Sequence, residues 1–511
     1  MGYVKRTALL AAALVAVLAT PAQAGQVIVV DGNHAKRVND PAVPTRAEIA
    51  LGMPVGGRAA VASASRARAA GVRARTSSKR GRRAVYRALR REVRRKRITR
   101  AEYRRWRRTY VRSVRTLRRL QGARATQLRY VFTSVESLAL RGRLGATRMP
   151  AAFVQLERNR RYWPRMPYPG VGDQVSFRGS EVLYQYFAGE GLQLHPLSTF
   201  KKANAMYGFC NRGESACDEA GHRRLLDEMT SFAVQRGRRF IAWEYMFYFG
   251  GGSPPWISGM AQATAIQAYG RAASLWNEPE MNRVAQRALG AFSARPPRGV
   301  RTRGPRGGIH YLQYSFAPRL YIFNAFLQSL IGLYDFSNLA DDARARRLYD
   351  VAVEEGRAEV PLSDVGDWSR YSYAGAESNR DYHELLREFL ASLCSRRQGA
   401  VFCEYARRYR GYQVDPPGVT YRGPVTATED RPVALRFSLS KLSAVQVTVR
   451  RPDGSVVFDR LGTFRRGGGS FTWTPRGPST FTVRVAAKEL RTGQGKRDSE
   501  TTEVVVENRP G

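Results

Sequence analysis

The hydrophobic residues of this chain change their spacing once, at the segment VDPPGV of residues 414–419. Before this segment, apolar residues recur at the three- and four-residue intervals of amphipathic helices. After it, they alternate with polar residues, as in TFTVRVA (480–486), and such segments separated by turns are typical of an antiparallel β-sandwich. We therefore expect a helical domain over residues 126–413 and a β-sandwich over 414–511.

The helical part carries one pattern after another of helical period, separated by Gly and Pro, while strand-like pieces such as QVSFRG (174–179) are the minority. Paired helices that stack around an axis form an α/α toroid, whose loops line a central cleft. We therefore predict a mainly α chain with an α/α-toroid-like domain and some β segments. The C-terminal segment is similar to the immunoglobulin-like modules of secreted bacterial proteins, which favours a spacer or docking role.

The N-terminal region predicts export. Residues 1–24 hold a basic start, the apolar run ALLAAALVAVLAT and the small residues AQA, which is the pattern of a secretory signal peptide. No later apolar run reaches the roughly 18 residues that cross a bilayer. We expect a secreted chain, extracellular or cell-wall associated, with no membrane span. Residues 25–78 lack any period and predict a disordered basic leader.

Residues 79–125 are rich in arginine but also carry an apolar stripe. Trp106, Tyr110 and Val114 recur at helical spacing, and TRAE at 99–102 is a capping box. We expect a helical hairpin that docks through this stripe and turns a basic face outward. The basic face could grip phosphate or polysaccharide, or it could simply be solvated.

The charge balance favours an anionic partner. Lys and Arg number 85 against 42 Asp and Glu, a formal charge of +43. Such a field raises the local concentration of polyanions, and export argues against nucleic acid as the natural one. An acidic polysaccharide or an anionic cell-wall polymer fits this charge, although a base-composition bias toward arginine codons would also produce it.

The four cysteines fall into two local pairs, Cys210 with Cys217 and Cys394 with Cys403. Because an exported chain meets oxidising conditions, and local pairing closes the shortest loops, we predict two disulfides. Free buried thiols are the alternative. No histidine stands at ligand spacing beside either pair, so no metal site is expected.

Three motifs carry a resemblance to a known family. PWISGMAQATAI (255–266), YLQYSFAPRLYIFNAFLQSLIGLYD (311–335) and RDYH (380–383) resemble successive motifs of the C-terminal domain of D-glucuronyl C5-epimerases. The resemblance covers about 150 residues. It implies an isomerase that inverts carbon 5 of glucuronate in an acidic polysaccharide, without a cofactor and as a homodimer.

The chemistry implied needs two proton-transfer groups that flank the sugar ring. By resemblance, the catalytic residues are Tyr314, Tyr371 and Tyr382. A tyrosine ordinarily titrates near pH 10, so a catalytic one needs a cationic neighbour, such as Arg319, Arg370 or Arg380, or hydrogen bonds that favour the phenolate. The predicted substrate-binding residues are Trp256, stacking on a sugar face, Gln262, Gln313, Arg319, Asn324, His383 and Glu244. Without the resemblance, tyrosines and a lone amide on apolar helices would be read as core.

One residue departs from the family pattern. The animal enzymes carry a glutamate where this chain has Gln313, and an amide cannot transfer protons. Either two tyrosines make both transfers, or a carboxylate such as Glu244 or Glu377 substitutes, or activity is lost. The stretch from Tyr371 to Tyr382 is also shorter than in the animal enzymes. The alternatives to an epimerase are a uronate polysaccharide lyase and a non-catalytic glycan-binding protein.

Overall fold

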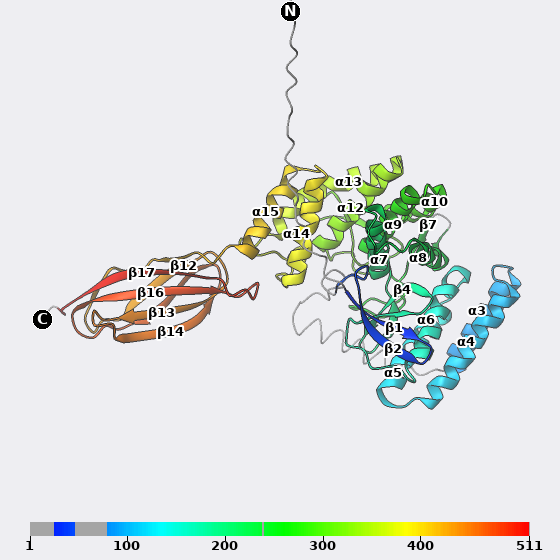
Figure 1. The fold of residues 1–511 in the computed structure, drawn as a ribbon, viewed down its shortest axis with the longest axis horizontal. Helices are drawn as coiled ribbons and strands as arrows, with labels where there is room; N and C mark the ends of the chain where they lie inside the picture. Colours follow the sequence, from blue (N-terminus) through cyan, green and yellow to red (C-terminus); the bar gives the residue numbers. More distant parts are fainter. Residues whose placement is uncertain (1–24, 46–78, 238–239, 510–511) are drawn as a thin grey trace, which may run out of the picture.

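The structure is a computed structural model that describes residues 25–45, 79–237 and 240–509. The predicted signal peptide and residues 46–78 of the predicted leader lie outside these ranges. Figure 1 shows a large body of helices around one sheet, from which a β module extends beyond helix α15 (Ala400–Val414). Among the described residues, no helix is both long and apolar enough to span a bilayer.

The prediction of a mainly α chain with an α/α toroid is wrong, because 45% of the described residues are helical and 25% lie in strands. A five-stranded sheet of order β2-β1-β3-β4-β5 lies in the large body. Its strands β3 and β5 are buried on both faces, and β3 coincides with the strand-like piece QVSFRG that the sequence shows. The strands are β1 (Gly25–Asp31), β2 (His34–Asp40), β3 (Gln174–Phe177), β4 (Ser180–Phe187) and β5 (Gly191–Leu194).

The first part of the predicted disordered leader is also wrong, because β1 and β2 form there. They pair antiparallel over residues 25–40, and β1 runs parallel to β3. The apolar run VIVV gives β1 side chains to bury. The basic and polar β2 then lies at the edge of the sheet.

The Arg-rich helices α3 (Lys79–Arg94) and α4 (Arg100–Arg119) dock on α5 (Gly122–Leu140) and α6 (Met149–Tyr162). The capping box at the start of α4 is confirmed, since Glu102 N donates to Thr99 Oγ1 at 3.1 Å and Thr99 N donates to Glu102 Oε2 at 2.8 Å. Buried Trp106 stacks on Phe153. The apolar stripe therefore faces the body.

Two apolar helices, α9 (Gly259–Trp276) and α12 (Phe323–Leu339), form the centre of the helical part. They approach closely at Gly332, because glycine has no Cβ. A Cβ at this position would lie 2.5 Å from the Ala263 carbonyl oxygen. The elements around them are α7 (Pro196–Asn211), α8 (Glu219–Ser231), β6 (Val234–Arg236), β7 (Phe240–Ala242), α10 (Pro279–Ala288), α11 (Gly290–Ser293), β8 (Arg301–Arg303), β9 (Ile309–Tyr311), α13 (Ala343–Glu359) and α14 (Arg380–Ser395).

Both predicted disulfides are confirmed. Cys210 at the end of α7 is bonded to Cys217, and Cys394 in α14 is bonded to Cys403 in α15. The second bond ties the last helix of the body, from which the C-terminal module continues, to the helix that precedes it.

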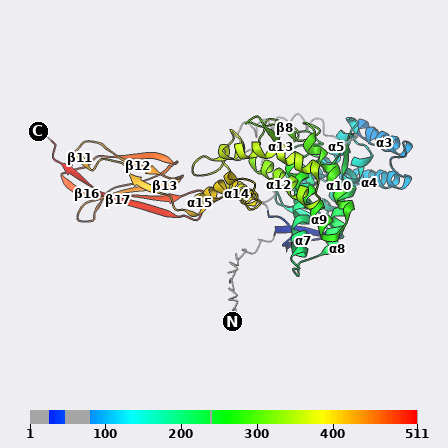
Figure 2. The ribbon, with the colours of Figure 1, turned by 90° about the horizontal axis from the view of Figure 1, so that it is seen from above.

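The C-terminal module has its own core, formed by alternating residues such as Val445, Val447, Val483 and Val485. Its two sheets have the orders β10-β12-β15 and β11-β17-β16-β13-β14. The module is not wholly antiparallel, because β11 pairs parallel with β17. Figure 2 shows it extending from the body past α14 and α15. Its strands are β10 (Val419–Tyr421), β11 (Thr426–Thr428), β12 (Val433–Leu439), β13 (Ser443–Arg450), β14 (Val456–Phe464), β15 (Gly467–Trp473), β16 (Ser479–Glu489) and β17 (Arg497–Glu507).

Candidate active site

The three tyrosines singled out in the sequence lie together, although they come from three separate segments. Tyr314 follows β9, Tyr371 lies in the loop before α14, and Tyr382 stands in the first turn of α14. The rings of Tyr371 and Tyr382 have centroids 4.7 Å apart, and the side chain of Tyr314 is hydrogen-bonded to that of Tyr371. The fold therefore gathers these phenols into one cluster, which we call the tyrosine cluster.

Two amides hold the tyrosine cluster in place. Asn324, near the start of α12, donates its Nδ2–H to the Tyr382 carbonyl oxygen at 3.1 Å. Gln313 is hydrogen-bonded to Tyr314, and its Oε1 accepts a hydrogen bond from the Ser258 hydroxyl at 3.3 Å. Both amides are nearly buried. Asn324 thus fixes the backbone at Tyr382, whereas Gln313 acts on the Tyr314 phenol itself.

Ser258 was not among the predicted site residues. Its hydroxyl caps α9 by accepting a hydrogen bond from Ala261 N at 3.2 Å, and it also donates to Gln313. The signal was present as a serine just before a helical pattern, which is an N-cap preference. Its second contact joins residues 55 positions apart, a separation that local pattern cannot foresee.

Burial raises the pKa of all three phenols above its ordinary value because the charged form loses its solvation. For Tyr314 the hydrogen bonds from Tyr371 and Gln313 act in the opposite direction and favour the phenolate. For Tyr371 the bond to Tyr314 adds to the rise in its pKa. Tyr314 is therefore the member of the cluster whose anion is best supported by hydrogen bonds.

The expected cationic neighbour is not found among the described residues. Burial is the largest influence on the pKa of each phenol in the cluster, and no arginine is among the main ones. Arg319 is exposed, and the guanidinium of Arg370 donates to the Gly375 carbonyl oxygen at 3.0 Å. The phenols are neutral at pH 7, so their first capability is to donate hydrogen bonds and protons.

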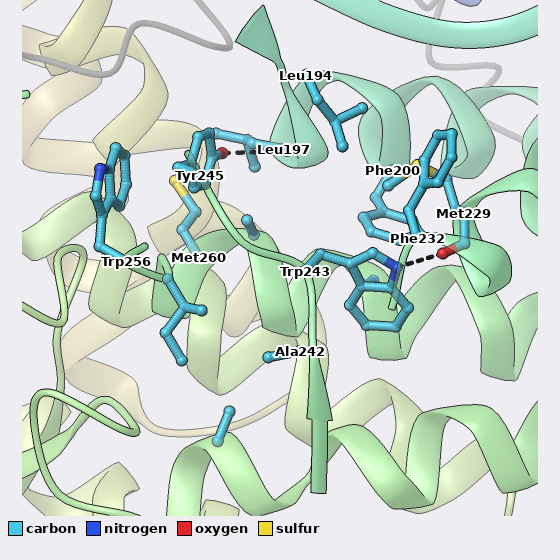
Figure 3. Close-up of a cluster of buried hydrophobic side chains, with 14 of the residues drawn as sticks. Leu194, Leu197, Phe200, Met229, Phe232, Ala242, Trp243, Tyr245, Trp256 and Met260 are labelled. Atoms are coloured by element: carbon cyan, nitrogen blue, oxygen red, sulfur yellow. Dashed lines mark hydrogen bonds between the residues drawn. The ribbon is translucent and has the colours of Figure 1, made fainter. Parts of the chain in front are cut away.

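Trp256 and Gln262 do not have the open faces that substrate binding requires. Trp256 is 1% exposed and stacks on Tyr245 at a centroid distance of 4.2 Å. Figure 3 shows the two rings next to each other within a cluster of buried side chains. Gln262 is fully buried and bonds both backbone groups of Trp243, at 3.1 and 2.9 Å. In the structure both side chains are taken up by contacts within the core, and their contact with sugar stays a prediction.

His383 and Glu244 are also committed to internal contacts. His383 is buried against Trp368, with ring centroids 3.6 Å apart, and contacts Ser369 Oγ and the Tyr409 carbonyl oxygen. Burial lowers its pKa to about 4. Glu244 accepts from Arg148 and Arg236. For both residues, the contact with substrate stays a prediction.

A pair of titratable side chains, His310 and Glu359, joins β9 to the end of α13. Glu359 Oε1 is 2.8 Å from His310 Nδ1, and both side chains are buried. Burial, with a hydrogen bond to Glu355, raises the pKa of Glu359 to about 10, and burial lowers the pKa of His310 to about 3. Both groups are therefore neutral at pH 7. In the ranges that the structure describes, no group of three or more His, Cys, Asp or Glu could hold a metal ion.

The Glu359→Gln variant is expected to stabilise the protein increasingly as the pH rises. Unfolding restores the ordinary pKa of Glu359, so between about pH 4.3 and 10 the native state binds a proton that the unfolded state releases. Wild-type stability from this group therefore falls with pH, and glutamine removes that loss of at most about 1.4 kcal/mol per pH unit. Urea unfolding at pH 5 and pH 8 measures it. An equal difference at both pH values would contradict it.

The comparisons with known proteins concern the segment that holds the tyrosine cluster. Residues 236–411 match the family described as D-glucuronyl C5-epimerase C-terminus. This part of the chain belongs to the D-glucuronyl C5-epimerase family. The segment includes Tyr314, Tyr371 and Tyr382, and the family assignment made from the three sequence motifs is confirmed.

Two curated proteins are similar to this chain. A D-glucuronyl C5-epimerase of Caenorhabditis elegans is 30% identical over 178 residues, which are 31% of this chain and 29% of that protein. An uncharacterized protein of Methanocaldococcus jannaschii is 24% identical over 190 residues, 36% of this chain and 62% of that protein. The matches thus span less than two thirds of either relative.

Among solved structures, the CARDB domain of a Pyrococcus furiosus protein in complex with di-metal ions matches 18% of this chain and 90% of that chain, with 14% identity and a TM-score of 0.14. An engineered protein matches 61% of this chain and 82% of its own, with 13% identity and a TM-score of 0.15.

Proposed function

We propose that this protein is a secreted isomerase that inverts carbon 5 of glucuronate residues in an acidic polysaccharide. The observation that carries the proposal is the convergence of Tyr314, Tyr371 and Tyr382, from three segments, within the part of the chain that belongs to the epimerase family. The reaction requires one group to remove a proton from a carbon next to a carboxylate and another to return a proton to the opposite face.

In the proposed mechanism, Tyr314 acts as phenolate and takes the proton from carbon 5. The electron pair of the broken C–H bond moves into the carboxylate as an enediolate. Hydrogen bonds from Tyr371 and Gln313 support the Tyr314 anion before the transfer. Tyr382, neutral because of its burial, donates its proton to the other face of carbon 5. The bond to the 4-linked sugar stays intact, so no cofactor or co-substrate is consumed.

Gln313 has a role in this mechanism that a glutamate would not have. An amide cannot accept the substrate proton, but its N–H can donate to a phenolate. This chain has no glutamate at the family's position, so another group must act as the base. In the proposed mechanism this group is Tyr314, whose anion receives hydrogen bonds from both Gln313 and Tyr371. Glu244 and Glu377 do not act as the base, since each is held by two arginines.

The test is incubation of the purified protein with glucuronate-containing oligosaccharides in heavy water. Deuterium at carbon 5 of an intact oligosaccharide supports the proposal. New ultraviolet absorbance from an unsaturated uronate means that the 4-linked sugar leaves and that the protein is a lyase. Binding with neither signal means a non-catalytic glycan-binding protein, and both of these results overturn the proposal.

The positive charge of the chain supports an acidic substrate. Several arginines lie together in one groove. A cavity of about 470 Å³ between α4 and α6 is lined by Arg105, Arg108 and Arg112 on one side and by Arg158, Arg161 and Glu157, which pairs with Arg161, on the other. In the described part of the chain, the three arginines of α4 make no ion pair, and all three are exposed. Their spacing places them along one face of the helix. The groove is therefore suited to carboxylates or sulfates of a long chain.

Reversing the three charges of α4, as R105E/R108E/R112E, is expected to weaken binding of a polyglucuronate about 100-fold at low salt and much less at high salt. The control is R422E/R431E/R436E, which changes the net charge equally at exposed positions of the C-terminal module. Titration calorimetry measures both. An equal loss in the two variants would show that net charge alone, and not the groove, binds the glycan.

A further inference from the structure

The loop that carries Tyr371 is in contact with the C-terminal module. Arg491, which follows β16, donates Nη1–H to Glu377 Oε2 at 2.5 Å and Nη2–H to Asp367 Oδ2 at 3.2 Å. These two carboxylates stand on either side of Tyr371 in the sequence. A single guanidinium from the module thus joins the two arms of the loop at residues 364–379.

The contact is largely shielded from solvent. The side chains of Arg491 and Asp367 are 10% and 5% exposed. Asp367 Oδ2 also accepts a hydrogen bond from Leu442 N of the module at 3.0 Å, and Glu377 also pairs with Arg465 at 3.2 Å. Because charge pairs removed from water interact more strongly than surface pairs, the Arg491–Asp367 pair fixes the loop more firmly than the exposed Glu377–Arg465 pair does.

The module itself is anchored to the end of the body. Lys441, in the turn between β12 and β13, donates its Nζ–H groups to the carbonyl oxygens of Asp415 and Tyr412, at 2.7 and 3.1 Å. Lys441 is nearly buried. This anchor holds the module at α15, so that Arg491 reaches the loop.

The contacts of Arg491 continue through the loop to the tyrosine cluster. Arg491 lies over the ring of Trp368, which stacks on His383, the residue after Tyr382. Trp368 Nε1–H donates to the Ser378 carbonyl oxygen at 2.8 Å. Nearer the tip, Tyr371 N donates to the Ala376 carbonyl oxygen at 3.0 Å. Both arms are thus closed behind Tyr371, and the stack extends to the helix that carries Tyr382.

We infer that the C-terminal module is a positioning element of the active site, in which Arg491 holds the loop 364–379 so that Tyr371 meets Tyr314 and Tyr382. The module is then more than the spacer or docking unit that its sequence suggests. Its catalytic consequence rests on the proposed function, whereas the mechanical claim about the loop does not. The expectation is that a loosened loop separates Tyr371 from Tyr314 and removes a hydrogen bond from the proposed base.

The test uses the full chain with R491A, R491K and, as a control on the same module, R484A, an exposed arginine of β16. Hydrogen exchange of the peptide 364–379, followed by mass spectrometry, should become about tenfold faster in R491A and stay unchanged in R484A. R491K, which keeps one charge-assisted contact, should lie between them. Unchanged exchange of this peptide in R491A overturns the inference.

The same variants separate this inference from the proposed function. If the wild type epimerises, kcat of R491A should fall between about 10- and 100-fold with little change in KM, with partial recovery in R491K. Faster loop exchange with unchanged kcat overturns the positioning role. If the wild type shows no epimerisation, the proposed function fails, but the exchange result still decides whether the module holds the loop. Should R491A not fold, R491Q/D367N, which leaves no unpaired buried charge at Asp367, takes its place.

Discussion

The Tyr314→Phe variant is expected to lose about 10²- to 10⁴-fold of the rate of deuterium incorporation at carbon 5, the range that general acid–base groups contribute. The change removes only the hydroxyl that would take the substrate proton and leaves the aromatic packing against Trp256 and Phe316 in place. Proton NMR of an oligosaccharide in heavy water measures the rate. The loss should appear in kcat, since the ring still fills its site.

The matched control is Tyr321→Phe, which lies in the same segment and packs against His310 outside the tyrosine cluster. It should retain the wild-type rate. If Tyr314→Phe also retained it, the base would have to be another group. An unchanged rate in Tyr371→Phe would leave Tyr314 as base but remove the supporting hydrogen bond from the mechanism.

The pH dependence of kcat/KM provides an independent check on the identity of the base. Because burial raises the pKa of Tyr314, the phenolate fraction increases with pH throughout the neutral and alkaline range. The rate should therefore rise from pH 6 to pH 9 without reaching a plateau. A carboxylate base would instead be ionised by about pH 6 and give a flat profile above it. A flat profile would contradict the assignment of Tyr314.

The sequence predicted those features of the fold that are encoded locally. The capping box at Thr99, the two cysteine pairs and the change from helical to alternating spacing near residue 414 all depend on residues close in sequence. The central sheet as a whole was not predicted. The piece QVSFRG marked β3 as a strand, whereas its pairing with β1 joins residues more than a hundred positions apart. No local pattern shows such a pairing.

The candidate site shows the same division. Family resemblance placed Tyr314, Tyr371 and Tyr382 in one site, and the fold brings them together, although periodicity alone would have assigned them to the core. It could not show that Gln262 would bond the backbone of Trp243, since a polar residue in a helix has the same spacing whether it faces a cleft or the interior. The charge partners of Glu244 lie 96 and 8 residues away in sequence, so its structural role required the fold.

The Glu244→Gln variant tests that role and is expected to destabilise the protein by about 3–5 kcal/mol, the cost of removing one member of a buried charge cluster. Glu244 accepts from Arg148 at 2.5 and 2.9 Å and from Arg236 at 3.1 Å, and the side chains of these residues are 0%, 14% and 10% exposed. Glutamine keeps the shape but leaves two arginines without their shared counter-charge. Urea unfolding measures the loss.

The control for this variant is Glu280→Gln, whose partner Arg283 is exposed, as Glu280 itself is, so that solvent replaces the lost pair at little cost. The two functions considered for Glu244 predict opposite results. If it were the base that replaces the family glutamate, Glu244→Gln would abolish exchange at carbon 5 while the protein kept its stability. If Glu244 is a structural counter-charge, Glu244→Gln should lower the free energy of unfolding in urea. The folded fraction of the variant should then still exchange the proton at carbon 5 at the wild-type rate.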